Sequence, residues 1–295
     1  MRVLLDSRDL INLIEHSRPT TSQEFDAYLR SHNDEVVLTF TNVRELAGPL
    51  ATGGDFMRLR PFLQSLEQMP HAYLKEVTIV AIEIQAAVEA FNAGTEYPEN
   101  RSPYVTRWDR TLMTPPGQQR SATDNWVNLR LDEIIYYIRR FNPGIFAPPK
   151  HHLGNLQAIL QNDRNALRAG QAPARQHFIR SIKAHAATHR VSLPNGREDE
   201  FAEWVYANPG RCPGLRLNHE TYRALMANYA DIPETADFSD LAQICALPYV
   251  DAATLDRRMC HYTTVASRKI LKLRGPINYV DREYRDVADF MQRHP

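Results

Sequence analysis

The sequence has few cysteines, no net charge and no long apolar run, and each shortage excludes a class of protein. The three cysteines, Cys212, Cys245 and Cys260, lack CxxC spacing, which excludes a disulfide framework or zinc ribbon and favours reduced thiols. The 35 basic and 35 acidic side chains cancel, so a nucleic-acid partner would need a local cationic patch. No stretch approaches the ~20 apolar residues of a membrane helix, and Asp6 interrupts any signal-peptide apolar region. We therefore expect a cytoplasmic protein that is not bound to a membrane.

The composition that remains is that of an ordinary globular protein. Apolar residues make up 43% of the 295 residues and charged residues 24%, enough for a sizeable core. This length fits one domain with a large insertion as well as it fits two domains.

The first 49 residues have the pattern of alternating strands and helices. In chain order the pattern predicts a strand at 3–5, a helix at 10–14, a helix at 22–31, a strand at 36–40 and a helix at 42–46. We expect Asp9 to cap the first of these helices and Thr41 to cap the third. A β-α-α-β-α order is typical of a doubly wound, mostly parallel sheet. Ligands gather at the carboxyl ends of such strands, where Asp6 and Glu45 are expected.

The middle of the chain has a different pattern, dominated by helical periodicity. The sequence predicts helices at about 77–91, 131–141, 152–168, 174–189, 198–207 and 218–229. The α/β pattern then returns, with a helix at 237–247, a strand at 249–255, a helix at 258–272, a strand at 277–280 and a terminal helix from 282. We therefore predict a discontinuous α/β core, 1–49 and 236–295, interrupted by an all-helical insertion at 50–235.

Four short motifs in this core resemble the PIN-like domain, a nuclease family that includes bacterial toxins and RNA-processing enzymes. The matching segments are Val3-Leu4-Leu5-Asp6-Ser7, Thr41-x-x-Arg44-Glu45-Leu46, Asp240-Leu241-Ala242 and Thr254-Leu255-Asp256-Arg257. The resemblance covers roughly 1–49 and 236–295, whereas the middle matches no pattern of the family. Arg8 departs from the small polar residue that is usual there, which puts local substrate contacts in doubt.

The resemblance implies that Asp6, Glu45, Asp240 and Asp256 are catalytic carboxylates that hold Mg²⁺ or Mn²⁺. One or two such ions can activate water and stabilise the leaving oxyanion of a phosphodiester, and these hard cations prefer carboxylate oxygens. We expect Asp6, Asp240 and Asp256 to be the principal metal ligands, with Glu45 as a further ligand or an outer base. Without metal, repulsion should make at least one of the four bind a proton. Asp237 is a candidate ligand for a second metal site.

Basic residues near these acids are candidates for binding substrate phosphate. Arg44 and Arg257 are favoured because each adjoins an acid of the motif, and a wider set contains Arg8, Arg258, Arg268, Lys269, Lys272 and Arg274. The alternative for all of them is a solvated charged face.

Each acid also has a structural explanation. An aspartate at a helix start is commonly an N-cap, which could account for Asp237 or Asp240, and Asp256 could be a solvated turn residue. Asp251 stands five residues before Asp256 on the predicted strand, roughly 16 Å away, which is too far to share an ion. We interpret it as structural.

Two other motifs point elsewhere. His185 and His189 have the i, i+4 spacing of a zinc pair, but Ala186 stands where a metalloprotease has its glutamate. Arg180 and His185 form an R-x-x-x-x-H pair that resembles the catalytic motif of HEPN-type ribonucleases.

The function we expect is endoribonuclease activity, of a toxin or defence type, with an antitoxin or defence protein as a candidate partner. RNA is favoured over DNA only because most members of the family are thought to cut RNA. The alternatives are a non-catalytic PIN scaffold that binds RNA or protein and a structure-specific DNA nuclease. The sequence leaves the oligomeric state open, with a homodimer among the options.

Overall fold

The computed structural model of the chain describes 1–14, 21–47, 56–74, 76–99, 101–105, 131–133, 135–136, 161–162, 164–166, 174–228, 230–231, 236–272 and 283–294. Within these residues the chain is an α/β protein. Its centre is a sheet with the strand order β4-β3-β2-β1-β5-β6.

Five of the described strands run parallel and one runs antiparallel. The parallel strands are β1 (Arg2–Leu4), β2 (Glu35–Thr39), β3 (His71–Leu74), β5 (Ala252–Thr254) and β6 (Glu283–Tyr284). Strand β4 (Tyr104–Val105) pairs antiparallel with β3 at one edge. The mostly parallel sheet that the first residues predict is therefore present, and β5, from the other end of the chain, lies directly beside β1.

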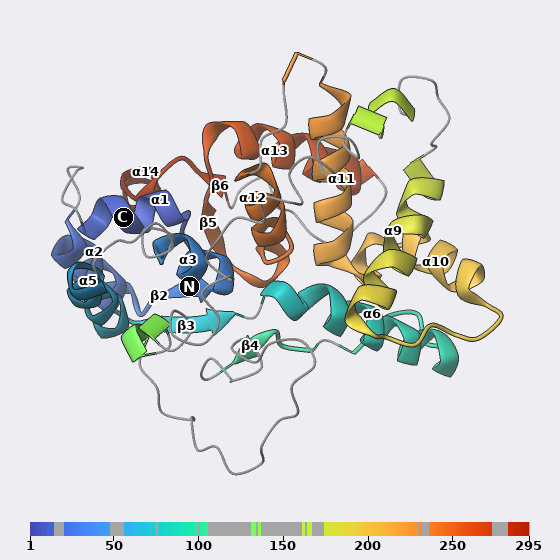
Figure 1. The fold of residues 1–295 in the computed structure, drawn as a ribbon, viewed down its shortest axis with the longest axis horizontal. Helices are drawn as coiled ribbons and strands as arrows, with labels where there is room; N and C mark the ends of the chain where they lie inside the picture. Colours follow the sequence, from blue (N-terminus) through green and yellow to red (C-terminus); the bar gives the residue numbers. More distant parts are fainter. Residues whose placement is uncertain are drawn as a thin grey trace, which may run out of the picture.

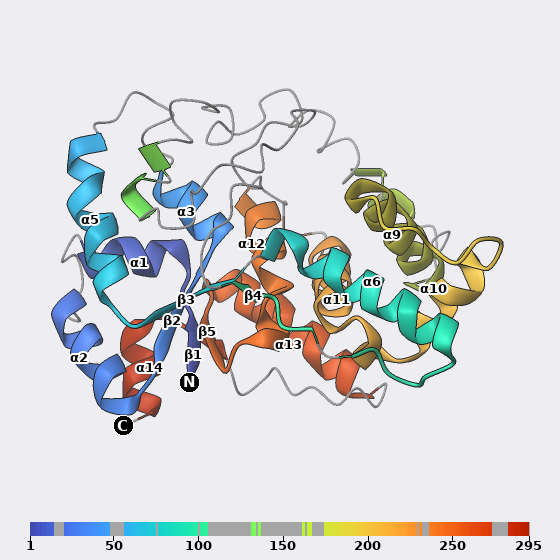
Figure 2. The same cartoon turned by 90° about the horizontal axis from the view of Figure 1, so that it is seen from below.

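Helices cover both faces of this sheet, which divides the described core into two layers (Figures 1 and 2). One face carries α1 (Ser7–Ile14), α2 (Ser22–His32), α5 (Phe56–Gln68) and α14 (Val287–Arg293). The other carries α6 (Glu76–Ala93), α12 (Ala236–Ile244) and α13 (Arg257–Lys272). Alternate residues of β1 separate the two layers, since Leu4 packs into the second and Val3 into the first.

A group of helices stands beside the sheet rather than over it. It contains α9 (Ala174–His189), α10 (Glu198–Ala207) and α11 (Pro213–Ala227), which pack with α6 and share its apolar core (Figures 1 and 2). The helices expected at 77–91, 174–189 and 198–207 are confirmed, and the one expected at 218–229 begins five residues earlier. Pro213 starts it, at the first-turn position that proline favours.

The expectation that 50–235 is entirely helical is wrong, because this region contains the strands β3 and β4. His71-Ala-Tyr-Leu74 and Tyr104-Val105 extend the sheet beyond β2. Neither has the continuous apolar run that marks β1 and β2, because β3 is only half buried and β4 has two residues. Pairing with a strand distant in sequence, rather than local pattern, makes them strands.

Several boundaries also differ from expectation. The predicted strand at 249–255 is β5 alone, preceded by the 3-10 turn η5 (Leu247–Tyr249). The terminal helix begins at Val287, where Asp286 caps it, and β6 occupies 283–284. The predicted strand at 277–280 and most of the predicted helix at 152–168 lie outside the described residues. No helix in the part of the chain that the structure describes is both long and apolar enough to cross a bilayer.

Candidate active site

The candidate site lies at the carboxyl edge of the sheet, where β1, β2 and β5 end and the helices that follow them begin. Two residues after β1 comes Asp6, and two residues after β5 comes Asp256, on a neighbouring parallel strand. The two junctions are joined directly, because the Asp6 backbone N–H donates to Thr254 Oγ1 at 2.8 Å.

Both aspartates cap the helix that follows them. Asp6 Oδ1 accepts from the Arg8 backbone N–H at 2.7 Å, and Asp256 Oδ1 accepts from the Met259 backbone N–H at 2.7 Å. The expected cap Asp9 instead lies buried inside the first turn of α1. Each capping carboxylate uses one oxygen, and the described residues provide no hydrogen bond to the other. The N-cap explanation and a ligand role are thus compatible for Asp6 and Asp256.

Glu45 comes to this edge on α3 (Phe40–Leu46), whose start is fixed by a buried polar cluster. Thr39, not the expected Thr41, is the N-cap, and it forms a reciprocal capping box with Asn42. The same Asn42 side chain donates to the Leu5 carbonyl at 3.0 Å and to Ser7 Oγ at 2.9 Å, so it ties α3 to the junction that carries Asp6.

Asp240 lies on α12, a helix that packs against α3 and α13. Its pKa is raised to about 8, by burial first and then by the negative charges of Asp256, Asp6, Glu45 and Asp237. Such Coulombic effects act over short range, so Asp6, which is more than 200 residues from Asp240 in sequence, lies near it in the fold. No described cation pairs with Asp240 or Glu45.

Asp6 has the same kind of environment in a milder form. Burial raises its pKa and the charge of Asp256 adds to this, whereas the Arg8 backbone N–H and the Arg8 guanidinium lower it. The net pKa of Asp6 stays above its ordinary value. Acids therefore gather at this edge of the sheet, and we call the group of Asp6, Glu45, Asp240 and Asp256 the acidic pocket.

The chemistry of these side chains suits a hard divalent cation, but their positions are not those of a complete coordination shell. The described residues contain no group of three His, Cys, Asp or Glu side chains close enough to ligate one ion. The donors are all carboxylate oxygens, and a cation there would remove the repulsion that raises the Asp240 pKa.

Asp237 has a different environment from the other acids. Its Oδ1 lies 3.1 Å from Arg258 Nη1, and the Nε of the same guanidinium lies 2.8 Å from Asp231 Oδ2. Asp237 is thus already compensated, although the sequence makes it a candidate ligand for a second ion. Arg258, one of the wider set of basic residues, serves this bridge.

The remaining sequence candidates divide by position. Arg257 is exposed at the first position of α13, next to Asp256, and Arg44 is half-buried on α3. Asp251 lies at the opposite end of β5, where it accepts from the Arg2 backbone N–H at 2.8 Å. That place agrees with the structural interpretation of Asp251.

His185 and His189, the candidate zinc pair, lie next to each other on α9. The rings of His185 and His189 stack at 6.2 Å, and burial lowers the pKa of both. The described residues offer no third ligand that would make this pair a metal site. Arg180 lies exposed on the same helix α9.

Sequence reasoning missed the polar side chains that support the edge, namely Ser7, Asn42 and Thr254. Ser7 and Asn42 are buried, and Thr254 is 1% exposed. Small polar residues next to strand ends are a weak signal in a single sequence. Asn42 donates to Ser7, and Thr254 accepts from the Asp6 backbone N–H, so these buried side chains join the segments that carry the acids.

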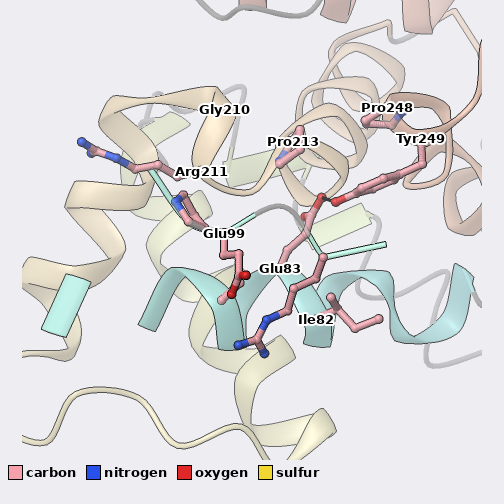
Figure 3. A pocket seen from close by; sticks show the side chains of 11 residues that line it. Ile82, Glu83, Glu99, Gly210, Arg211, Pro213, Pro248 and Tyr249 are labelled. Carbon is pink, nitrogen blue, oxygen red and sulfur yellow. Dashed lines mark hydrogen bonds between the residues drawn. The ribbon is translucent and has the colours of Figure 1, made fainter. Parts of the chain in front are cut away.

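A separate cavity of about 250 Å³ lies among α6, η4 (Pro209–Arg211), the start of α11 and η5 (Figure 3). None of the four acids lines it. Its wall includes Glu83 and Tyr249, whose polar ends point toward each other, with Tyr249 Oη donating to Glu83 Oε1 at 2.6 Å. Oε1 and Oε2 of Glu83 also accept from the Gly214 and Leu215 backbone N–H groups, at 2.6 and 2.9 Å. Glu83 therefore caps α11 from another helix, and we interpret this region as structural.

Comparisons of the whole chain with models of protein families, with curated proteins and with solved structures find no match.

Proposed function

We propose that this protein is a metal-dependent nuclease of the PIN-like type that hydrolyses RNA. The observation that supports this most is the gathering of Asp6, Glu45, Asp240 and Asp256 at the carboxyl edge of a parallel sheet, without a described cation to neutralise Asp240. A protein that needed only a scaffold would gain no stability from such repulsion.

In this proposal each side chain has a defined task. The uncommitted oxygens of Asp6 and Asp256, together with Asp240, would hold Mg²⁺ or Mn²⁺. A bound ion supplies a nucleophilic water and stabilises the departing oxyanion. Glu45 would serve as a further ligand or as an outer base, and Arg44 and Arg257 would bind the substrate phosphates. Asn42 keeps Glu45 at a fixed position relative to Asp6.

The direct test is cleavage of labelled RNA, single-stranded DNA and double-stranded DNA in Mn²⁺. We expect RNA cleavage by the wild-type chain and at least a hundredfold loss in Asp240→Asn, in the range seen when a main electrostatic group is removed. The matched control is Asp251→Asn, which removes an acid of the same sheet at the opposite edge. Cleavage of DNA alone would favour the structure-specific DNA nuclease, and equal RNA cleavage by both variants would refute the assignment of the site.

A thermal-shift titration separates the enzyme from a non-catalytic PIN scaffold. Mn²⁺ at a hundred times its dissociation constant should stabilise the wild-type chain by about 2.7 kcal/mol. Asp6→Asn should lose most of this gain, whereas Asp251→Asn should keep it. A scaffold that binds RNA or protein would show no metal-dependent gain in any of the three chains.

A toxin or defence role, with an antitoxin as partner, stays part of the proposal. It requires that expression in a host stops growth only when Asp240 is intact. Arg180→Ala tests the rival HEPN-like centre, because that variant should retain RNA cleavage if the acidic pocket is the active site.

A further inference from the structure

Helix α13 leads away from the acidic pocket and has an unusual charge pattern. It begins directly after Asp256, its 16 residues include five Lys or Arg, and it contains no acid. The whole chain, by contrast, has equal numbers of basic and acidic residues. The cations of α13 are therefore a local concentration and do not reflect the overall composition.

The inner side of α13 belongs to the apolar core. Met259, Tyr262, Ala266 and Ile270 are buried and recur at helical spacing. Two cations at the flanks of this side are neutralised. Arg258 pairs with Asp231 and Asp237, and Lys269 Nζ lies 2.5 Å from Glu220 Oε2.

The outer side of α13 carries Arg257, His261 and Arg268, all exposed. At about 100° per residue these positions fall within roughly 40° of one another, on one line along the helix. None of the three has an ion pair with any described residue. With a rise of about 1.5 Å per residue the line is roughly 16 Å long, the span of about five phosphates of a helical strand.

The place of Arg257 is unfavourable for the helix itself. A cation in the first turn opposes the helix dipole, which favours acids at that end. Arg258 in the same turn is compensated by two aspartates, whereas Arg257 is not. A residue that breaks a local stability rule without a structural partner points to function.

We propose that Arg257, His261 and Arg268 form a phosphate-binding ridge on α13 that holds a single RNA strand and directs it to the acidic pocket. This inference rests on the proposed nuclease function. It assigns the route of the substrate along a named helix face and adds His261 and Arg268 to the residues that contact it.

The test measures binding of a labelled single-stranded RNA in EDTA, where cleavage does not interfere. The variant is Arg257→Gln/Arg268→Gln, and the control is Arg180→Gln/Arg190→Gln, which removes the same charge from exposed positions on and just after α9. We expect the first pair to weaken binding roughly tenfold or more, since hydrogen bonds to charged groups are among the stronger contacts. The slope of log affinity against log salt should fall by about 1.4, or about 0.7 per lost phosphate contact. The control should change neither quantity.

Thermal unfolding shows whether the variant is merely damaged. Because Arg257 and Arg268 have no described partner, the double variant should keep the wild-type melting temperature, and Arg257→Gln alone should leave it unchanged or slightly higher.

The outcomes separate this inference from the proposed function. RNA binding that depends on the ridge, without any cleavage in Mn²⁺, would support the ridge and refute the nuclease. Cleavage of RNA together with equal affinity and equal salt slope in both double variants would refute the ridge and leave the nuclease standing. Absence of RNA binding by the wild-type chain would overturn the ridge.

Discussion

Two carboxyl groups in this protein, Asp240 and Glu83, both bind a proton more readily than usual, yet their surroundings are opposite. The pKa of Asp240 is raised to about 8 by burial and by four neighbouring acids. Burial raises the pKa of Glu83 to about 7, although hydrogen bonds from the Tyr249 hydroxyl and the Leu215 and Gly214 N–H groups act to lower it.

The difference separates a structural acid from a candidate functional one. Glu83 is surrounded by donors that a carboxylate satisfies, so it holds α6, α11 and η5 together. Asp240 is surrounded by charges of its own sign and has no described donor. A perturbed pKa alone does not identify a functional site; the kind of neighbour that causes the shift does.

The largest effect should come from removing the structural acid. Glu83→Ala leaves the Gly214 and Leu215 N–H groups and the Tyr249 hydroxyl without their partner, at about 1–3 kcal/mol for each buried donor. We expect unfolding in urea to show a loss of about 3 kcal/mol or more. Glu89→Ala, which removes an exposed acid of the same helix, should cost less than about 1 kcal/mol. Equal losses would show that Glu83 is no more important to the fold than an exposed acid of α6.

The second largest effect should come from removing Asn42, which joins α3 to the segment that carries Asp6. Asn42→Ala removes the bonds to Leu5 and Ser7 and half of the α3 capping box, and it should cost about 2 kcal/mol. We also expect RNA cleavage to fall, because Glu45 would lose its fixed position relative to Asp6. Asn195→Ala, at an exposed site, serves as the control. Full cleavage by a destabilised Asn42→Ala protein would separate the pocket from this support.

Removing the candidate functional acid, Asp240, should change the free energy of unfolding in the opposite direction. The pKa of Asp240 rises from 3.8 in the unfolded chain to about 8 in the folded one, so stability is fully present below the lower value and is lost as pH rises through 8. In EDTA near pH 9, Asp240→Asn should therefore be more stable than wild type, by roughly 1–2 kcal/mol after allowance for solvent screening. Asp251→Asn should show no such gain. A loss of stability in Asp240→Asn at that pH would show that the carboxyl is compensated after all.

The smallest expected effect concerns the hydrogen bond between Tyr249 and Glu83, the structural acid. Tyr249→Phe removes one hydrogen bond to Glu83 and should cost about 1 kcal/mol. That hydrogen bond lowers the pKa of Glu83, so without it the pKa should rise above about 7. In the wild type, the contribution of Glu83 to the free energy of unfolding is fully present below pH 4.5 and is lost as pH rises through about 7. In Tyr249→Phe this loss should extend to higher pH. Unfolding followed across this range in an Asp240→Asn background would isolate the change.

What could be predicted from the sequence was local. The apolar runs before Asp6 and around Val37 are the strands β1 and β2, and apolar spacing at 77–91 is the helix α6, because burial of a strand or helix face leaves its own period in the sequence. The acids at the ends of these elements were visible for the same reason.

The tertiary structure alone decided the surroundings of each side chain. Strands β3 and β4 exist because a neighbouring strand supplies hydrogen bonds that four and two residues cannot provide themselves. Nothing in a linear pattern distinguishes Asp237, which a guanidinium neutralises, from Asp240, which is left among acids. Charges interact through space and not along the chain. Asp6 and Asp256 therefore affect each other only because β1 pairs with β5, which brings both residues to one edge of the sheet.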